Sequence, residues 1–139
     1  MAETNQRNAY GKTLVELCRE NRNIVVLDAD LGASTMGKMV ESEADIADQH
    51  IEMGIAEANM LSTAGGLSRV GKIPFCASFA VFAAGRAYDQ IRQSIAIGKL
   101  NVKICGSSAG CSDFGDGATH QSVDDLAYMR VIPNMQVFV

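Results

Sequence analysis

Three short segments of the sequence hold the side chains best suited to chemistry. Glu57 stands in the largely apolar segment 54–60, the segment 78–82 contains two phenylalanines, and the segment 116–121 contains an aspartate and a histidine. An apolar surrounding lets a carboxyl group keep its proton near neutral pH, because desolvation disfavours the charged form. A carboxyl group and an imidazole can exchange protons, and aromatic rings can pack on a flat ligand.

Each of these residues also has a purely structural interpretation. Glu57 could be a helix-start acid stabilised by the helix dipole, and Phe79 and Phe82 could be ordinary core residues. His120 lies in a polar, glycine-rich loop, which weakens a core role and favours a functional one. From the residues alone, the sequence indicates an α/β ligand-binding domain and leaves its chemistry open.

Other apparent motifs do not support a site. Gly11-Lys12-Thr13 resembles the end of a phosphate loop, but Gln6 replaces the glycine that the loop requires. Gly115-Asp116-Gly117 resembles a magnesium motif, yet the later Asn134 is too close, so no metal is assigned. The cysteines form no C-x-x-C pair, and we expect reduced, mostly buried thiols, with Cys111 in the polar loop as the exception.

Composition predicts one folded domain over residues 1–139. Apolar residues make up 47% of the chain and charged residues 20%, as in ordinary globular proteins. The net charge of -4 and the absence of a basic run argue against a nucleic-acid partner. No signal peptide or membrane-spanning stretch is evident, so we expect a cytoplasmic protein without a membrane partner.

Short apolar runs alternate with helical patterns along the chain. The predicted strands cover residues 24–27, 50–53, 73–78, 101–106 and 135–139. The predicted helices cover residues 5–21, 37–41 and 56–70, a segment after 78 with apolar Ala84, Tyr88, Ile91 and Ile95, and a segment through Met129 capped by Ser122 and Asp125. This alternation predicts an α/β fold, with a mostly parallel sheet and helices on both faces.

The three chemical segments occur together in the order and approximate spacing of the pyrimidine-binding domain of transketolases. They are Gly54-Ile55-Ala56-Glu57-Ala58-Asn59-Met60, Ser78-Phe79-Ala80-Val81-Phe82 and Asp116-Gly117-Ala118-Thr119-His120-Gln121. Asp30 to Ser34 upstream and Arg130 to Met135 downstream extend the resemblance over nearly the whole chain. The resemblance implies the thiamine diphosphate-binding fold.

The resemblance also implies a role for each cofactor residue. Glu57 would meet N1′ of the aminopyrimidine and share its proton, which favours the tautomer that deprotonates the thiazolium carbon. Phe79 and Phe82 would stack on the pyrimidine, and Asp30 would also contact the cofactor. A third aromatic residue of many relatives is Gly85 here, and Tyr88 is a candidate replacement.

The substrate residues follow from the same resemblance. Asp116 and His120 would face the hydroxyl groups of the sugar and help its proton transfers. Arg7 and Ser34 match positions that bind the sugar phosphate, whereas Ser108 replaces a histidine of that phosphate site. Arg7 could equally be a solvated surface charge.

In this family the cofactor lies between two domains, and the other domain binds Mg²⁺ and the diphosphate. That domain and a third, C-terminal domain are absent from this sequence, which ends on Val137-Phe138-Val139 as if more protein normally followed. The chain therefore resembles the first part of a transketolase C-terminal half, as in a split enzyme with an N-terminal partner subunit. We expect a homo-oligomer, typically a dimer, that is inactive without the partner.

The expected activity of the assembly is transfer of a two-carbon ketol unit between sugar phosphates, as in the pentose phosphate pathway. An alternative is 1-deoxyxylulose-5-phosphate synthase, which shares the Arg86-Ala87-Tyr88-Asp89-Gln90 and Asp116 to Gln121 patterns. The beta subunit of 2-oxoacid dehydrogenases matches the latter segment less well. A third possibility is a non-catalytic assembly module that has kept the fold.

Overall fold

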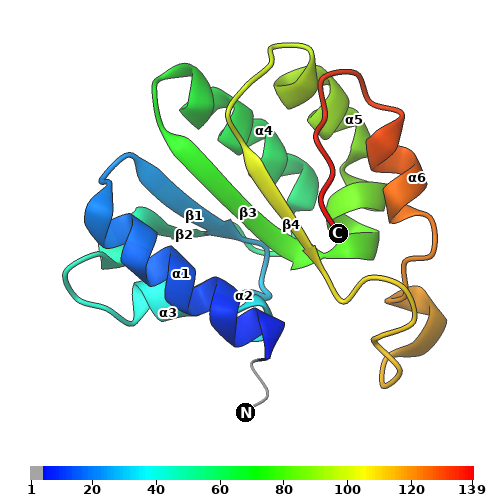
Figure 1. Ribbon diagram of the computed structural model, residues 1–139, viewed down its shortest axis with the longest axis horizontal. Coiled ribbons are helices and arrows are strands. Elements are labelled where there is room, and N and C mark those ends of the chain that lie inside the picture. The colour runs from blue at the N-terminus through cyan, green and yellow to red at the C-terminus, as the bar shows by residue number, and fades with distance from the viewer. Residues whose placement is uncertain (1–4) are drawn as a thin grey trace.

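Four parallel strands form the sheet of this protein, a computed structural model of which is described here over residues 5–139 (Figure 1). The strands are β1 (Ile24–Asp28), β2 (His50–Glu52), β3 (Ile73–Phe79) and β4 (Lys103–Ser107), in the spatial order β2-β1-β3-β4. The chain passes from β1 to its neighbour on one side, then returns to β3 on the other side. The prediction of a parallel α/β sheet is therefore confirmed.

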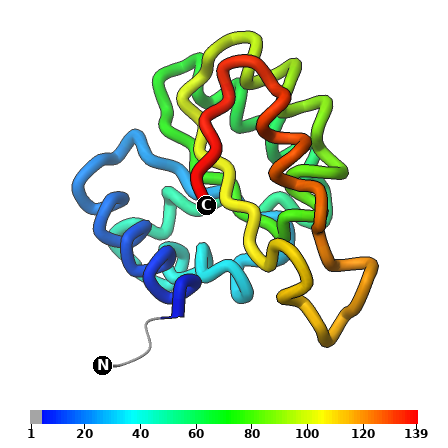
Figure 2. The backbone as a smooth tube through the Cα atoms, turned by 45° about the vertical axis from the view of Figure 1, so that its right-hand side comes forward, coloured from blue at the N-terminus to red at the C-terminus, as the bar shows by residue number. Residues whose placement is uncertain are grey.

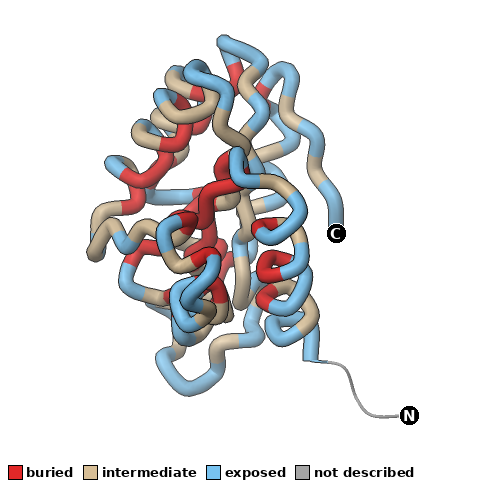
Figure 3. Tube along the Cα trace, turned by 90° about the vertical axis from the view of Figure 1, so that its left-hand side faces the viewer, coloured by how far each residue is buried: buried red, intermediate tan, exposed pale blue. Residues whose placement is uncertain are grey.

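Helices cover both faces of the sheet, as predicted. The first face carries α1 (Gln6–Glu20), α2 (Gly32–Thr35), α3 (Lys38–Glu41) and the 3-10 turn η1 (Ala47–Gln49). Along β1, Ile24 and Val26 pack toward α1, whereas Val25 and Leu27 point to the opposite face. This alternation follows from the two-residue period of a strand, and it gives β1 a core on each side. Figure 3 shows the buried parts of the chain gathered in the interior of the molecule.

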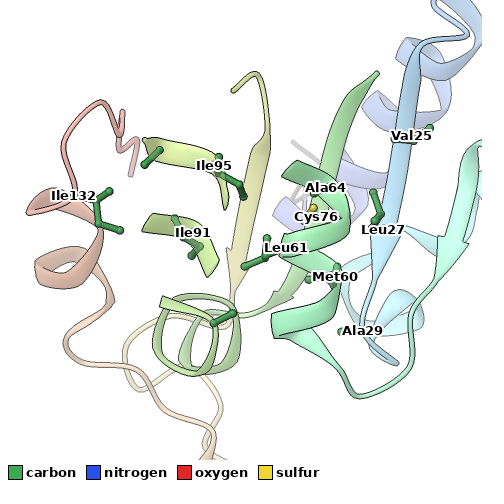
Figure 4. Close-up of a cluster of buried hydrophobic side chains, with 12 residues drawn as sticks. Val25, Leu27, Ala29, Met60, Leu61, Ala64, Cys76, Ile91, Ile95 and Ile132 are labelled. Atoms are coloured by element: carbon green, nitrogen blue, oxygen red, sulfur yellow. The ribbon is translucent and has the colours of Figure 1, made fainter. Parts of the chain in front are cut away.

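The second face is covered by α4 (Glu57–Arg69) and by an irregular helical segment after β3. That segment consists of the π-helical turn η2 (Val81–Arg86), α5 (Tyr88–Gln90) and the π-helical turn η3 (Ile91–Ala96). Its predicted apolar stripe is buried at Ile91 and Ile95, which pack with Leu61 and Ile132 (Figure 4). The sequence predicted the buried stripe but not the wider turns, which often occur at functional sites.

The predicted last strand, residues 135–139, is wrong. This segment runs beside β4 (red in Figure 1) but forms no strand. A cavity of about 850 Å³ is lined both by β4 residues and by residues 134–138, so a hollow rather than a hydrogen-bonded ladder lies along this edge. Phe138 and Val139 are exposed instead of buried.

The predicted capping box is also wrong. Helix α6 (Asp125–Arg130) begins after Asp124, and no side chain caps its first turn. Ser122 instead pairs through its backbone with Gly110, with N···O distances of 2.7 and 3.1 Å. This bridge closes the long loop between β4 and α6, which holds the 3-10 turn η4 (Gly117–Thr119) and projects from the body (orange in Figure 2).

Among residues 5–139, the longest helices are too short or too polar to cross a lipid bilayer.

Two adjacent glycines of α4 provide a test of how this helix packs. A Cβ atom added at Gly65 would lie 2.5 Å from the backbone oxygen of Ser94, whereas one at Gly66 would meet nothing within 4 Å. We expect Gly65→Ala to lower the free energy of unfolding by about 1–3 kcal/mol through overpacking. Gly66→Ala should raise it by about 0.5–1 kcal/mol through helix propensity. Urea denaturation measures both, and equal effects of the two substitutions would contradict the packing of α4 on η3.

Candidate functional site

The reversal of strand order between β1 and β3 creates a place for a ligand. In open parallel sheets, ligands bind beyond the carboxyl ends of the strands, at the point where the strand order reverses. There, the connections from two neighbouring strands lead to opposite sides. Asp30 follows β1, Phe79 ends β3 and Ser108 follows β4, so three predicted site residues lie at this edge. Glu57 reaches the same edge as the first residue of α4, which follows β2.

Glu57 is a buried acid paired with an arginine. Its side chain is 2% exposed, and Nη1 of Arg86 donates to Oε1 at 3.1 Å and to Oε2 at 2.9 Å. Its place at the start of α4 also lets the helix dipole favour its negative charge. The apolar surrounding expected for Glu57 is only partly present, because Met60 is fully buried but Ile55 is 73% exposed.

An aromatic cluster lies beside this ion pair. The rings of Phe79 and Phe82 are stacked, with centroids 6.3 Å apart and an interplanar angle of 17°. The ring of His120 meets both edge-on, at 6.1 and 5.2 Å. The guanidinium carbon of Arg86 lies 4.4 Å from the centre of the Phe82 ring, so Arg86 joins the acid to the aromatic cluster.

Tyr88, the candidate replacement for the missing third aromatic, lies elsewhere. Its ring packs edge-on against Tyr128 of α6, with centroids 6.1 Å apart. This contact belongs to the packing between α5 and α6 and leaves the wall of the site to Phe79 and Phe82.

The predicted phosphate residues lie together. Nη1 of Arg7 donates to the backbone oxygen of Ser34 at 3.2 Å. A cavity of about 420 Å³ is lined by Arg7, Phe79 and Ser108, together with Asn5, Gln6, Ser112 and Asp113. The larger cavity beside β4 has no contribution from Glu57, Phe79, Arg7 or His120. The smaller cavity, which has a guanidinium and shares Phe79 with the aromatic cluster, is therefore the better candidate for binding an anion.

Asp116 is not brought into this group. It is exposed in the loop before η4, and its backbone nitrogen lies 3.4 Å from Oδ1 of Asp113. His120 reaches the aromatic cluster from the same loop, and its Nδ1 lies 2.9 Å from Oγ1 of Thr119. The loop thus presents its histidine to the site while its aspartate faces solvent.

Asp30 lies at the sheet edge in a left-handed backbone conformation, and a hydrogen bond to Glu52 holds it there. Its φ angle is 59°, in the left-handed region, and its backbone nitrogen donates to Oε1 of Glu52 at 2.8 Å. The backbone nitrogen of Gly54 donates to the same oxygen at 2.9 Å. Glu52 therefore ties the loop that carries Asp30 to the turn that leads into Glu57.

The sequence analysis missed a buried polar network under this edge. Asp28 is fully buried; it accepts from Oγ1 of Thr35 at 2.8 Å and lies 3.0 Å from Nε2 of His50. A Cβ atom at Gly37 would overlap Oδ2 of Asp28, so the loop closes tightly around this carboxylate. The signal in the sequence was a charged residue at the end of an otherwise apolar strand.

Burial also controls several titrating groups near the sheet. Desolvation raises the pKa of Cys18 to about 11 and that of Cys76 to about 12, and it raises the pKa of Cys105. Burial, reinforced by nearby Cys105 and Asp28, raises the pKa of Tyr10 well above its usual value. Within the described residues, no three His, Cys, Asp or Glu side chains are grouped so that they could hold a metal ion.

A parallel α/β sheet with a buried acid–arginine pair and an aromatic cluster at the carboxyl ends of its strands is typical of α/β ligand-binding domains. The chain belongs to the transketolase family: the model of the transketolase pyrimidine-binding domain matches residues 2–139.

Relatives of this chain agree with that assignment. A candidate transketolase C-terminal section of Methanocaldococcus jannaschii is 48% identical over 94% of this chain and 41% of its own length. A 6-deoxy-6-sulfo-D-fructose transketolase subunit of a Clostridium species is 42% identical over 95% of this chain and 40% of its own. The chain thus spans about two fifths of these relatives.

A solved structure extends the agreement to the fold. A split-gene transketolase, described as an inactive beta4 tetramer, is 57% identical and superposes with a TM-score of 0.79 over 95% of this chain and 42% of that chain.

The buried network predicts a specific stability effect. Thr35→Val keeps the shape of the side chain but removes the hydroxyl that donates to Asp28, so we expect a loss of about 1–3 kcal/mol of unfolding free energy. Thr13→Val, at an exposed position of α1, is the matched control and should change little beyond helix propensity. Chemical denaturation measures both variants. Equal stability of the Thr35 variant and the parent would show that this hydrogen bond contributes nothing.

The thiols predict a pattern of chemical labelling. Cys111 is exposed, whereas Cys18 and Cys76 are buried and stay protonated in mildly alkaline buffer because of their raised pKa values. Iodoacetamide should therefore modify Cys111 first in the folded chain, and all four cysteines only after denaturation. Peptide mass spectrometry locates the labels, and early labelling of Cys76 would contradict the closed core.

Proposed function

We propose that this chain is the pyrimidine-binding part of a transketolase that transfers a two-carbon ketol unit between sugar phosphates. The observation that carries the proposal is the buried Glu57, which Arg86 links to the ring of Phe82 in the stacked Phe79–Phe82 pair. An acid at the start of a helix suits the edge of an aminopyrimidine, and nearby aromatic rings suit its faces.

The residues fit the pyrimidine of thiamine diphosphate, because a flat, nitrogen-bearing group already fits there: the Arg86 guanidinium contacts both the Glu57 carboxylate and the Phe82 ring. Thiamine diphosphate would supply the electron sink of the reaction. Glu57 would exchange a proton with N1′, and Phe79 and Phe82 would hold the ring by stacking. Asp30, which is exposed at the same edge, would complete the cofactor contacts.

His120 and the phosphate residues would handle the sugar. His120 lies against both phenylalanines, so it can reach a substrate bound next to the pyrimidine and move a proton on its hydroxyl groups. Arg7, Ser34 and Ser108 would hold the terminal phosphate. A Clostridium relative is named for a 6-deoxy-6-sulfo sugar, so a terminal anion other than phosphate is also compatible with this kind of site. Asp116 would join the substrate contacts if its loop folds toward the site in the assembly.

The complete site requires a partner in this proposal. An N-terminal transketolase subunit would bind Mg²⁺ and the diphosphate, and the assembly would be an oligomer, such as a dimer, in the cytoplasm. The related split-gene protein whose beta4 tetramer is described as inactive supports a chain that is inactive without such a partner.

The role of Glu57 predicts a loss of turnover. In the assembly with the N-terminal partner, Glu57→Ala should lower ketol transfer by roughly 100-fold or more, because it removes the proton-exchanging acid. Glu20→Ala, at an exposed position near the end of α1, is the matched control and should keep parental activity. A coupled transketolase assay measures both, and near-parental activity of the Glu57 variant would refute its role.

The same preparation separates the alternative functions. Supplying pyruvate with a triose phosphate, in parallel with a ketose phosphate donor and an aldose acceptor, distinguishes a 1-deoxyxylulose-5-phosphate synthase from a transketolase. A non-catalytic module would assemble with the partner yet bind no thiamine diphosphate and Mg²⁺ in calorimetry. Turnover of the ketose donor is the result that supports the proposal.

A further inference from the structure

Arg86 makes two contacts with the residues assigned to the pyrimidine. One guanidinium nitrogen donates to both oxygens of Glu57, and the guanidinium carbon lies 4.4 Å from the centre of the Phe82 ring. Among the described residues, Arg86 is the one side chain that donates hydrogen bonds to the Glu57 carboxylate. Arg86 thus covers both the acid and an aromatic face at the same time.

The chemistry of these contacts matches that of the aminopyrimidine. A guanidinium is flat, presents N–H donors to a carboxylate and stacks on an aromatic face. An aminopyrimidine bound through N1′ would need the same carboxylate and the same kind of face. The aminopyrimidine and the Arg86 guanidinium would use the same partners, the Glu57 carboxylate and the Phe82 ring. The two groups therefore cannot occupy this place together.

On this basis, and resting on the function proposed above, we propose that Arg86 is a displaceable competitor for the pyrimidine site. Its guanidinium holds Glu57 and Phe82 until the aminopyrimidine replaces it. The affinity for the cofactor then depends partly on the free energy of the contacts that Arg86 must give up. A ligand binds more weakly when only a small fraction of the protein has its site free.

The surroundings of Arg86 allow this exchange. Glu57 is 2% exposed, whereas the Arg86 side chain is 49% exposed, so the arginine can move into solvent while the acid stays in place. Arg86 also ends the π-helical turn η2, next to Ala87, whose φ of -108° and ψ of 20° interrupt the helical path before α5. The residue that moves therefore lies at an irregular junction rather than in a regular helix.

The inference can be tested by calorimetry on the assembly with its N-terminal partner. Arg86→Gln should tighten the binding of thiamine diphosphate with Mg²⁺ by roughly tenfold, because one charge-assisted contact no longer competes. Inorganic pyrophosphate with Mg²⁺ should bind the variant and the parent equally, since it has no pyrimidine. Arg69→Gln, an exposed arginine on α4 itself, is the matched control and should leave both affinities unchanged.

Thermal unfolding gives a second measurement, one that does not depend on activity. Without thiamine diphosphate, Arg86→Gln should lower the melting temperature of the assembly, because the buried Glu57 loses its partner. At saturating thiamine diphosphate the difference from the parent should disappear, because Arg86 no longer contacts Glu57 in either protein. The increase in melting temperature on adding thiamine diphosphate is therefore larger for the Arg86→Gln variant than for the parent.

The outcomes separate this inference from the proposed function. If the parent assembly does not bind thiamine diphosphate, the proposed function is wrong, and the inference fails with it. If the parent binds the cofactor but Arg86→Gln binds it equally or more weakly, Arg86 does not compete and this inference alone is overturned. Arg86→Lys, which keeps the charge but not the flat stacking group, should give an intermediate affinity.

Discussion

The site depends on the way β1 is held in the sheet. β1 is paired with β2 on one edge and β3 on the other, and all five of its residues are buried. Because the chain leaves β1 toward one neighbour and returns to the other, the loops after β1 and β3 diverge and open a space between them. Asp30 lies in the loop after β1, and Phe79 is the last residue of β3. Helix α4, which follows β2, begins with Glu57 at the same space.

Polar contacts of two acids, the buried Asp28 and the exposed Glu52, keep this edge in one arrangement. Asp28 ends β1 and holds Thr35 and His50, while Glu52 ends β2 and holds the backbone at Asp30 and Gly54. A buried carboxylate is costly unless its oxygens are satisfied, so paths of the loop after β1 that leave Asp28 without Thr35 or His50 are disfavoured. The positions of Asp30 and Glu57 thus depend on two acids that have no assigned part in the chemistry.

The sequence predicted those features that are encoded locally. The four strands of the sheet, α1, α4 and the buried stripe at Ile91 and Ile95 follow from apolar periodicity, which each segment carries by itself. The segment 135–139 shows the limit of that signal, because an apolar run forms a strand only where an edge accepts its hydrogen bonds. Ser122 likewise had the right spacing for a cap, but pairing with Gly110 fixed its position elsewhere.

Contacts between distant segments explain what the sequence could not give at the site. Glu57 and Arg86 are 29 residues apart, and the wider turn of η2 decides where Arg86 lies relative to Phe82. The resemblance singled out Glu57 and the two phenylalanines through their residue types and spacing, but it assigned no role to Arg86 beyond a shared pattern. An acid required to exchange a proton with a bound ring must be shielded from water, yet a shielded charge needs a partner. Arg86 meets that need at a position from which it can leave, so the same buried acid can remain satisfied before and after a flat ligand takes the place of the guanidinium.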